Sequence, residues 1–403
     1  ALSKPGSQSV VPIYLEAARA WVRGDNLYHW EPPRDLYRNP PGFAAAFVPF
    51  TLLPETGAEI AWRAVGAAVF LLGLGRWVRH GLPRPLTPAE TGAVFLLAAP
   101  LALASLNNGQ TNLILIGLLL LGATAAARQQ WRTAGAWLAA AATLKVYPLA
   151  VGLLVGLGAP RRLFPWLAVW CVLFAAVPFL LHDPAYVLDQ HWSFRATVRA
   201  DDRTFANLHR APRDLFLVLR VWFTPPAPAV YLGVKLAAAA GMAGLVVLVV
   251  RRTPDMRIAA PLALHLGCVW VTVLGPATET HTYTLLGPSA ATVPLFAWAD
   301  RASYRGKPRL VLALLGYGLL VSPVFRDIFP NGTEFQILGP QPVGGLLVLA
   351  VVVWDALRTR HPTIHPIVRS ARVAVGYPHP ESAAVFPARA EAGEDMIGVC
   401  PTQ

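Results

Sequence analysis

Long apolar runs, each close to the length that crosses a lipid bilayer, dominate this chain and leave it few possible folds. About nine of them occur, near 58–79, 87–107, 110–127, 163–181, 229–250, 257–275, 282–298, 308–325 and 341–357. Only 14% of the residues are charged, against about 25% in a soluble domain. Because a lipid-exposed backbone must satisfy its own hydrogen bonds, such runs form helices. The sequence predicts an all-α polytopic membrane protein with about 9–11 transmembrane helices plus re-entrant and interfacial helices.

The net charge of +12 is better explained by membrane topology than by nucleic-acid binding. Most of the excess lies in short loops beside apolar runs, where arginine and lysine mark the inner side of a membrane. Basic residues predicted to be inside are Arg76, Arg79, Arg84, Arg128, Arg132, Arg161, Arg162, Arg251, Arg252, Arg257, Arg301, Arg305, Lys307 and Arg309. The segments predicted to be outside are then 1–57, 107–112, 182–226, 276–281 and 326–340. These outer segments contain the polar clusters discussed below, except the cluster around Lys145.

Three shorter elements are predicted from local patterns. The segment 134–160 has both ends inside and contains Pro148, which breaks a helix, so a re-entrant pair of short helices is expected. The stretch Ile13 to Val22 is amphipathic and reads as an interfacial helix, and 42–54 is too short to span. The domains are therefore an outer segment 1–57, a transmembrane domain 58–357 with the outer loop 182–226, and a disordered cytoplasmic tail 358–403.

Several classes of function find no support in the sequence. No Walker loop, HExxH or GxSxG motif occurs, and the cysteines at 171, 268 and 400 have no metal-site or disulfide spacing. We therefore expect no cofactor and no metal, and an activated substrate that is lipid-linked. The chain opens on the polar stretch ALSKPGSQS, so a further span is expected to precede it.

Two polar clusters adjoin apolar helices directly. One is Tyr37-Arg38-Asn39-Pro40-Pro41-Gly42-Phe43, and the other is Asn107-Asn108-Gly109-Gln110-Thr111-Asn112, which LILIGLLLLG follows at once. Amide side chains at this depth are costly unless they form hydrogen bonds. Asparagine also caps helix N-termini well, and the two roles can coexist. We interpret both clusters as parts of one polar site at the outer face.

The order of these motifs resembles that of the GT-C membrane glycosyltransferases, specifically glycosyltransferase family 87, which includes polyprenol-phosphate-mannose-dependent α-mannosyltransferases. The matching pieces run in order over roughly 10–300. They are the helix from Tyr14 through Asp25 to Tyr28, the Tyr37–Pro41 cluster leading to Pro49 and Pro54, Asn108–Asn112, Leu144-Lys145-Val146-Tyr147-Pro148, and Gly275-Pro276 with His281. The Asn-Gly-Gln-x-Asn piece is the most specific.

The resemblance implies a helical fold with an outer-face active site and inverting transfer of a sugar from polyprenyl phosphate to an acceptor hydroxyl. It also implies an acidic general base in the first outer loop. Where the family usually has that aspartate, this chain reads Gln8-Ser9-Val10-Val11. Glu16 is the first substitute, and Asp25, Asp35 and Glu279 are the other candidates.

The remaining candidates each have a structural alternative. Asn108, Gln110, Asn112 and Tyr37 are predicted to bind the sugar or phosphate. Lys145 is predicted to contact phosphate, or else to snorkel from a short inner helix. His191 and Arg195 are predicted on the phosphate side, or in an ordinary charged loop. Glu279 and His281 stand where a span emerges on the predicted active side, or at a capped, solvated helix start.

The sequence thus predicts a membrane glycosyltransferase, a hexosyltransferase that takes a hexose such as mannose from a polyprenyl-phosphate donor to a lipid or glycan acceptor. Its partners would be these substrates and membrane lipids, in a bacterial plasma membrane, without nucleic acid. The alternatives are a lipid-sugar transporter or flippase, and a catalytically inactive relative that acts as a partner protein. Transporters usually show internal symmetry and polar residues near the midplane, whereas here the polar groups gather at one face.

Overall fold

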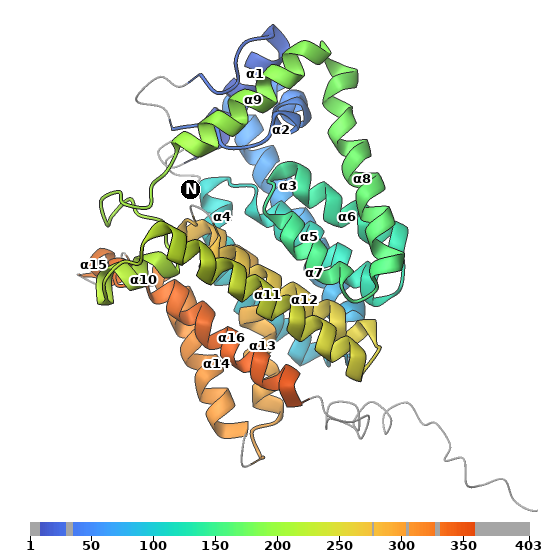
Figure 1. Cartoon of the computed structure of the whole chain (residues 1–403), viewed down its shortest axis with the longest axis vertical. Coiled ribbons are helices and arrows are strands. Elements are labelled where there is room, and N and C mark those ends of the chain that lie inside the picture. The colour runs from blue at the N-terminus through green and yellow to red at the C-terminus, as the bar shows by residue number, and fades with distance from the viewer. Residues whose placement is uncertain (1–8, 30–34, 276–277, 304–305, 327–330, 359–403) are drawn as a thin grey trace, which may run out of the picture.

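The described part of the chain is helical, without a strand, in the computed structural model (Figure 1). It comprises residues 9–29, 35–275, 278–303, 306–326 and 331–358. Seven helices in these residues are long and apolar enough to cross a membrane, and the all-α polytopic prediction is confirmed. The predicted tail and the first eight residues lie outside the described residues.

The seven long helices correspond to seven of the predicted apolar runs, and the other two runs form shorter helices. The long ones are α3 (Glu55–Arg76) with its π-helical end η2 (Trp77–Gly81), α4 (Pro88–Asn108), α8 (Pro160–Leu181), α11 (Pro228–Arg252), α12 (Met256–Val269) with η3 (Trp270–Leu274), α14 (Gly306–Val321) with η5 (Ser322–Phe325), and α16 (Pro340–Arg358). The shorter ones are α5 (Asn112–Ala127), and α13 (Gly287–Ala299) with η4 (Thr280–Leu286).

The N-terminal segment packs as an amphipathic layer on the bundle. Helix α1 (Val11–Arg23) ends at Gly24, whose φ of 77° is left-handed, a conformation that glycine adopts without steric cost. Its buried face packs on α2 (Pro41–Phe47) and η1 (Val48–Leu52). The ring centres of Tyr14 and Phe43 lie 4.9 Å apart. The amphipathic helix predicted at Ile13 to Val22 is therefore present, and its apolar face is covered by protein.

Helices α3 and α5 approach each other through glycines. A Cβ added to Gly73 would lie 2.5 Å from the carbonyl oxygen of Gly117, and one added to Gly117 would lie 2.5 Å from that of Val69. Small residues let membrane helices pack backbone to backbone. This contact holds α5, and with it the Asn112 end, against α3.

We expect Gly117→Ala to lower the free energy of unfolding by about 1–3 kcal/mol, because the added methyl group must push two backbones apart. Thermal unfolding of the detergent-solubilised protein would measure the loss. The matched control is Gly75→Ala in α3, where an added Cβ meets nothing within 4 Å. Equal stability of the two variants would contradict the close contact.

Helices α6 (Trp131–Leu144) and α7 (Pro148–Gly156) form the helix–break–helix pair that Pro148 predicts. Leu138 of α6 packs within van der Waals reach of Gly152, and Arg162 at the start of α8 lies over the Trp131 ring at 6.0 Å. The start of α6 and the end of α7, which leads into α8, therefore lie close together. The backbone between the two helices is extended at Lys145, and Lys145 Nζ donates to Asn112 Oδ1 of α5 at 3.3 Å.

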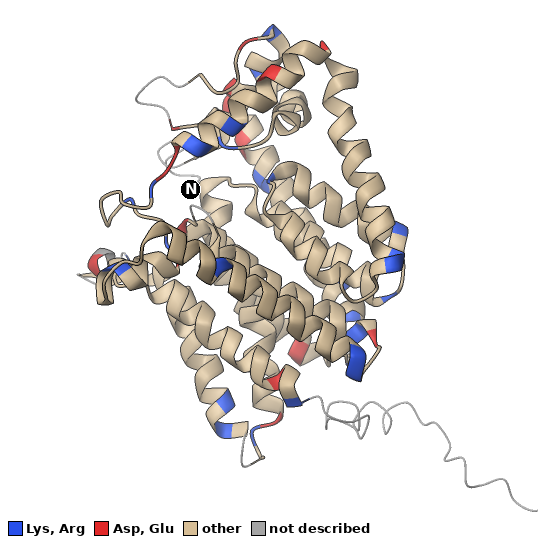
Figure 2. Cartoon of the chain, viewed as in Figure 1, with Lys and Arg blue, Asp and Glu red and all other residues tan. Residues whose placement is uncertain are grey.

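The second half of the chain completes the bundle around α12, the most buried of the long helices. The shorter helices that remain are α9 (Pro184–Ala200), which packs on α2 and α8, and α10 (Leu215–Trp222) and α15 (Gly332–Ile337), which pack on α16. Figure 2 shows lysine and arginine concentrated at helix ends and in loops, with the helix shafts largely uncharged. This arrangement leaves long apolar surfaces on α8 and α11 exposed, as expected for helices that contact lipid.

Candidate functional site

A cavity of about 550 Å³ lies where α1, the 35–39 segment, the α4–α5 turn, the α6–α7 break and the 198–217 region converge. Its polar lining residues include both signs of charge. Its charged and amide residues are Asp35, Arg38, Asn39, Asn108, Gln110, Lys145, Arg199, Asp201, Asp202, Arg203, Asp214, Arg220, Lys235 and Glu279. Such a concave site with converging polar groups is the default location for a ligand.

The amide cluster enters this cavity because α4 ends at Gly109. Its φ of 73° is left-handed, so the chain turns and begins α5 three residues later, at Asn112. The turn is tied down by the indole N–H of Trp62, which donates to the Gly109 carbonyl at 2.8 Å. The side chain of Gln110 then donates to the Glu279 carboxylate at 3.0 Å.

Asn112 is a fully buried junction that links four segments. Its Nδ2 donates to Gln110 Oε1 at 3.1 Å and to the His281 carbonyl at 3.0 Å. Its Oδ1 accepts from Lys145 Nζ at 3.3 Å and from the Tyr147 hydroxyl at 3.4 Å. The amide therefore positions Gln110 and Lys145 together, and its removal would leave several buried groups unpaired.

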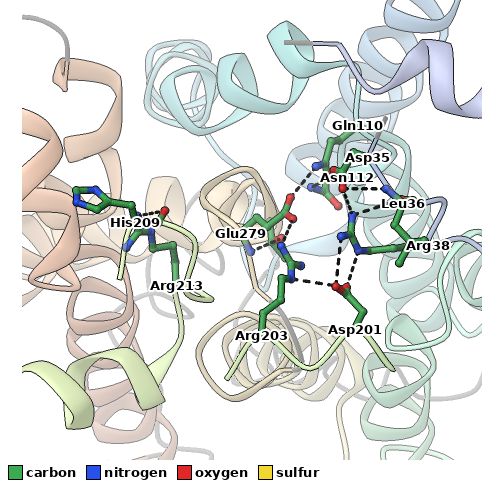
Figure 3. Close-up of polar contacts among 11 residues, drawn as sticks. Asp35, Leu36, Arg38, Gln110, Asn112, Asp201, Arg203, His209, Arg213 and Glu279 are labelled. Carbon is green, nitrogen blue, oxygen red and sulfur yellow. Dashed lines mark hydrogen bonds and ion pairs between the residues drawn. The ribbon is translucent and has the colours of Figure 1, made fainter. Parts of the chain in front are cut away.

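Ionic contacts of alternating charge extend from Glu279 across the cavity wall (Figure 3). Arg203 Nη1 lies 3.1 Å from Glu279, and its Nε lies 3.6 Å from Asp201. Arg38 then pairs with Asp201 at 2.6 Å and with Asp35 at 3.0 Å. Each of these arginines is thus paired with two carboxylates. An anionic ligand can therefore bind the arginines only by competing with those carboxylates.

Glu279 stays ionised in this setting. Burial alone would raise the pKa of its carboxyl group, but Arg203, Lys145 and the hydrogen bond from Gln110 outweigh burial and hold the pKa below its ordinary value. For the neighbouring His281, burial lowers the imidazole pKa and Glu279 only partly opposes this. The site thus pairs a carboxylate with cations that favour its charge.

Of the other candidate bases, Asp35 lines the cavity and pairs with Arg38, whereas Glu16 and Asp25 do not line it. Glu16 has a side chain 42% exposed and pairs with Arg23 at 3.1 Å and with Arg19 at 4.0 Å. Asp25 pairs with the same Arg23 at 2.6 Å. Of the predicted catalytic acids, Glu279 is brought together with the amides.

The remaining predicted residues, Asn112 among them, are not in the cavity lining. His191 stacks on Phe179 at 6.1 Å, and exposed Arg195 lies over the Trp192 ring at 5.7 Å, both on α9. Tyr37 is buried, and its hydroxyl donates to the Pro40 carbonyl at 3.2 Å. His281 contributes its backbone carbonyl, which accepts from Asn112.

The charged residues of the cavity wall that were not among the sequence-based candidates include Arg38, Asp201, Arg203 and Asp214. All four stand in segments that the sequence places outside, yet many charged residues share those segments. No local spacing separates them from their neighbours, because their partners are far away in sequence. In the parts of the chain that the structure describes, no group of three or more histidine, cysteine, aspartate or glutamate residues could hold a metal ion.

Comparison with known protein families matches residues 37–274 to the model of glycosyltransferase family 87. The matched range contains the Tyr37 cluster, the Asn108–Asn112 turn, the Lys145 break and the 182–226 region, and ends just before Glu279. No curated protein and no solved structure matches the chain.

Proposed function

The chain belongs to glycosyltransferase family 87 and is a multi-pass membrane glycosyltransferase, and from this premise we propose that it transfers a hexose such as mannose from a polyprenyl-phosphate donor to a lipid or glycan acceptor. The observation that carries the proposal is a cavity in whose wall amides and cations contact the Glu279 carboxylate. Gln110 and Asn112 connect Glu279 to Lys145. The amides can hydrogen-bond sugar hydroxyls, the cations can bind a phosphate, and the carboxylate can accept a proton.

Phosphate binding is the first step. Lys145 and Arg203 are the cations next to Glu279, and a donor phosphate would draw them away from that carboxylate. The amides of Gln110 and Asn108 line the same cavity and would hydrogen-bond the sugar. The Glu279 carboxylate would thereby lose the contacts that hold its pKa low, and become more basic when the donor is bound.

Sugar transfer then follows by one displacement. The acceptor oxygen attacks the anomeric carbon while its proton passes to Glu279, and the bond from that carbon to the phosphate oxygen breaks. The phosphate leaves with the bonding electrons, and its charge is offset by Lys145 and Arg203. Because the attack comes from the face opposite the leaving group, the anomeric configuration inverts.

The membrane setting is also part of the proposal. Basic residues gather at the start of α8 and the end of α11 (Figure 2), and these residues are not in the cavity lining, which supports a cavity on the outer side of a bacterial plasma membrane. Helix α9 carries His191 and Arg195, and Val198 and Arg199 in its last turn line the cavity. We assign His191 and Arg195 to contacts with lipid phosphates on the approach to the cavity.

Gln110→Ala is expected to abolish transfer without changing expression. The change removes the amide that bridges Asn112 and Glu279, so the carboxylate loses its fixed position. The test incubates purified protein with radiolabelled polyprenyl-phosphate-mannose and a membrane lipid extract, and counts the labelled product.

Gln130→Ala is the matched control, since Gln130 is exposed in the turn between α5 and α6. Unchanged turnover by Gln110→Ala would remove Gln110 from the mechanism. If the unaltered protein forms no product with mannose or with any other polyprenyl-phosphate sugar, the proposed donor is wrong.

A further inference from the structure

The proposed transfer step leaves part of the cavity wall unused. This wall is formed by α10, the loop before it and the first two turns of α11, which together supply a carboxylate, an ammonium group, a guanidinium group and aromatic rings. Its residues in the cavity lining are Asp214, Phe216, Leu217, Arg220, Tyr231 and Lys235. We call it the α10–α11 wall.

Asp214 is the charged centre of the α10–α11 wall. Its side chain begins α10 by accepting from the Leu217 amide at 3.3 Å, and the residue is only 6% exposed. Unlike Glu279, it forms no ion pair within the described residues. Burial raises the pKa of its carboxyl group to about 6, and backbone hydrogen bonds and Lys235 only partly oppose this.

The position of Asp214 relative to Glu279 is fixed by hydrogen bonds between their segments. The Arg213 amide donates to the Thr278 carbonyl at 2.6 Å, and the Tyr283 hydroxyl donates to the Arg213 carbonyl at 2.7 Å. Arg213 and Thr278 are thus hydrogen-bonded to each other, and the next residue along the chain from each is an acid, Asp214 and Glu279 respectively. The cavity thus holds two carboxylates on tied segments, one paired with cations and one not, an arrangement that suits two different roles.

Tyr231 and Lys235 complete the α10–α11 wall. The Tyr231 ring meets the edge of Phe216 at 5.1 Å, and Lys235 Nζ lies 4.6 Å from the Tyr231 ring centre. The Tyr231 hydroxyl is buried near the Phe216 backbone, and within 3.5 Å it makes no hydrogen bond in the described chain. An unpartnered buried hydroxyl is costly, and a ligand with its own hydroxyl groups would satisfy it.

We propose that Asp214, Tyr231 and Lys235 form the acceptor subsite, and that the acceptor presents a sugar or another polyol. The inference rests on the proposed glycosyl transfer and names the substrate class on its acceptor side. A carboxylate accepts hydrogen bonds from neighbouring hydroxyls, an ammonium group donates to them, and an aromatic ring packs on the apolar face of a sugar.

Asp214→Asn is the first test, because asparagine caps a helix as well as aspartate does and the fold should persist. The probe acceptors are octyl mannoside and 1-octanol, with labelled polyprenyl-phosphate-mannose as donor. We expect the KM for octyl mannoside to rise about 10- to 100-fold in this variant, since a charged hydrogen-bond partner is lost. The donor KM, and donor hydrolysis without acceptor, should be unchanged.

Tyr231→Phe is the second variant, and a smaller rise in the same KM is expected because one neutral hydroxyl is removed. Asp189→Asn, on the exposed surface of α9, is the matched control. The expected preference of the unaltered protein is for octyl mannoside over 1-octanol. Equal use of both acceptors would overturn the polyol assignment.

The two proposals fail in different ways. If the unaltered protein neither transfers mannose nor hydrolyses the donor, the proposed function is wrong. If transfer is normal and Asp214→Asn keeps its acceptor KM, the acceptor subsite is wrong. An equal loss of donor hydrolysis in Asp214→Asn would place Asp214 on the donor side and also overturn the inference.

Discussion

Glu279→Gln is expected to lower kcat about 10²- to 10⁴-fold, the range that a positioned general base contributes. Glutamine keeps the shape of the side chain and can still accept a hydrogen bond from Gln110, but it cannot take the acceptor proton. The donor KM should change little or fall, because Arg203 and Lys145 lose a competitor for the phosphate. Steady-state transfer with saturating acceptor would separate kcat from the donor KM.

Glu16→Gln is the discriminating control for this variant. Glu16 was the first candidate from the sequence, yet its carboxylate pairs with Arg19 and Arg23 at the surface of α1. We expect it to retain near-normal kcat. If Glu16→Gln is inactive and Glu279→Gln is active, the base is Glu16 and the cavity described here must rearrange when substrate binds.

Lys145→Met is expected to raise the donor KM at least about 30-fold, with a smaller effect on the acceptor KM. Removal of one buried partner from a hydrogen-bonded charge pair costs about 2–5 kcal/mol, and 2 kcal/mol corresponds to about 30-fold. Methionine preserves the length and apolar packing of the side chain between α6 and α7. Transfer rates at varied donor and fixed acceptor concentrations would measure the change.

Lys307→Met serves as the control, since Lys307 is exposed near the start of α14 and does not line the cavity. A donor KM that is unchanged in Lys145→Met would contradict the assignment of Lys145 to the phosphate. It would leave Lys145 as a structural partner of Asn112, and unfolding measurements would then show lower stability.

Much of the architecture follows from features that are local in the sequence. The apolar runs specify the helices because a span must supply about 20 residues that lipid accepts. Gly109 ends α4, and Pro148 begins α7, through their own backbone restrictions. The amides at 108–112 could be singled out because polar groups beside apolar helices are costly wherever the chain places them.

The partners of those groups could not be derived in the same way. Arg38 and Asp201 pair across 163 residues, and Arg203 and Glu279 across 76. Arg38 lies in the Tyr37–Phe43 cluster that the sequence singles out, but the sequence around Asp201 and Arg203 does not differ from an ordinary charged loop. The acid next to the amides was therefore one candidate among several, and Asp214 was not singled out at all.

The sequence by itself determined that this chain is a helical membrane protein of the glycosyltransferase type, where its helices break, and which amides need partners. Only the tertiary structure decided that Glu279, rather than Glu16, contacts Gln110, and that Asp214 joins the same cavity. Helix formation and lipid burial depend on neighbouring residues, so they can be read locally. The pairing of charges depends on which helices pack together, and that is settled by the whole bundle.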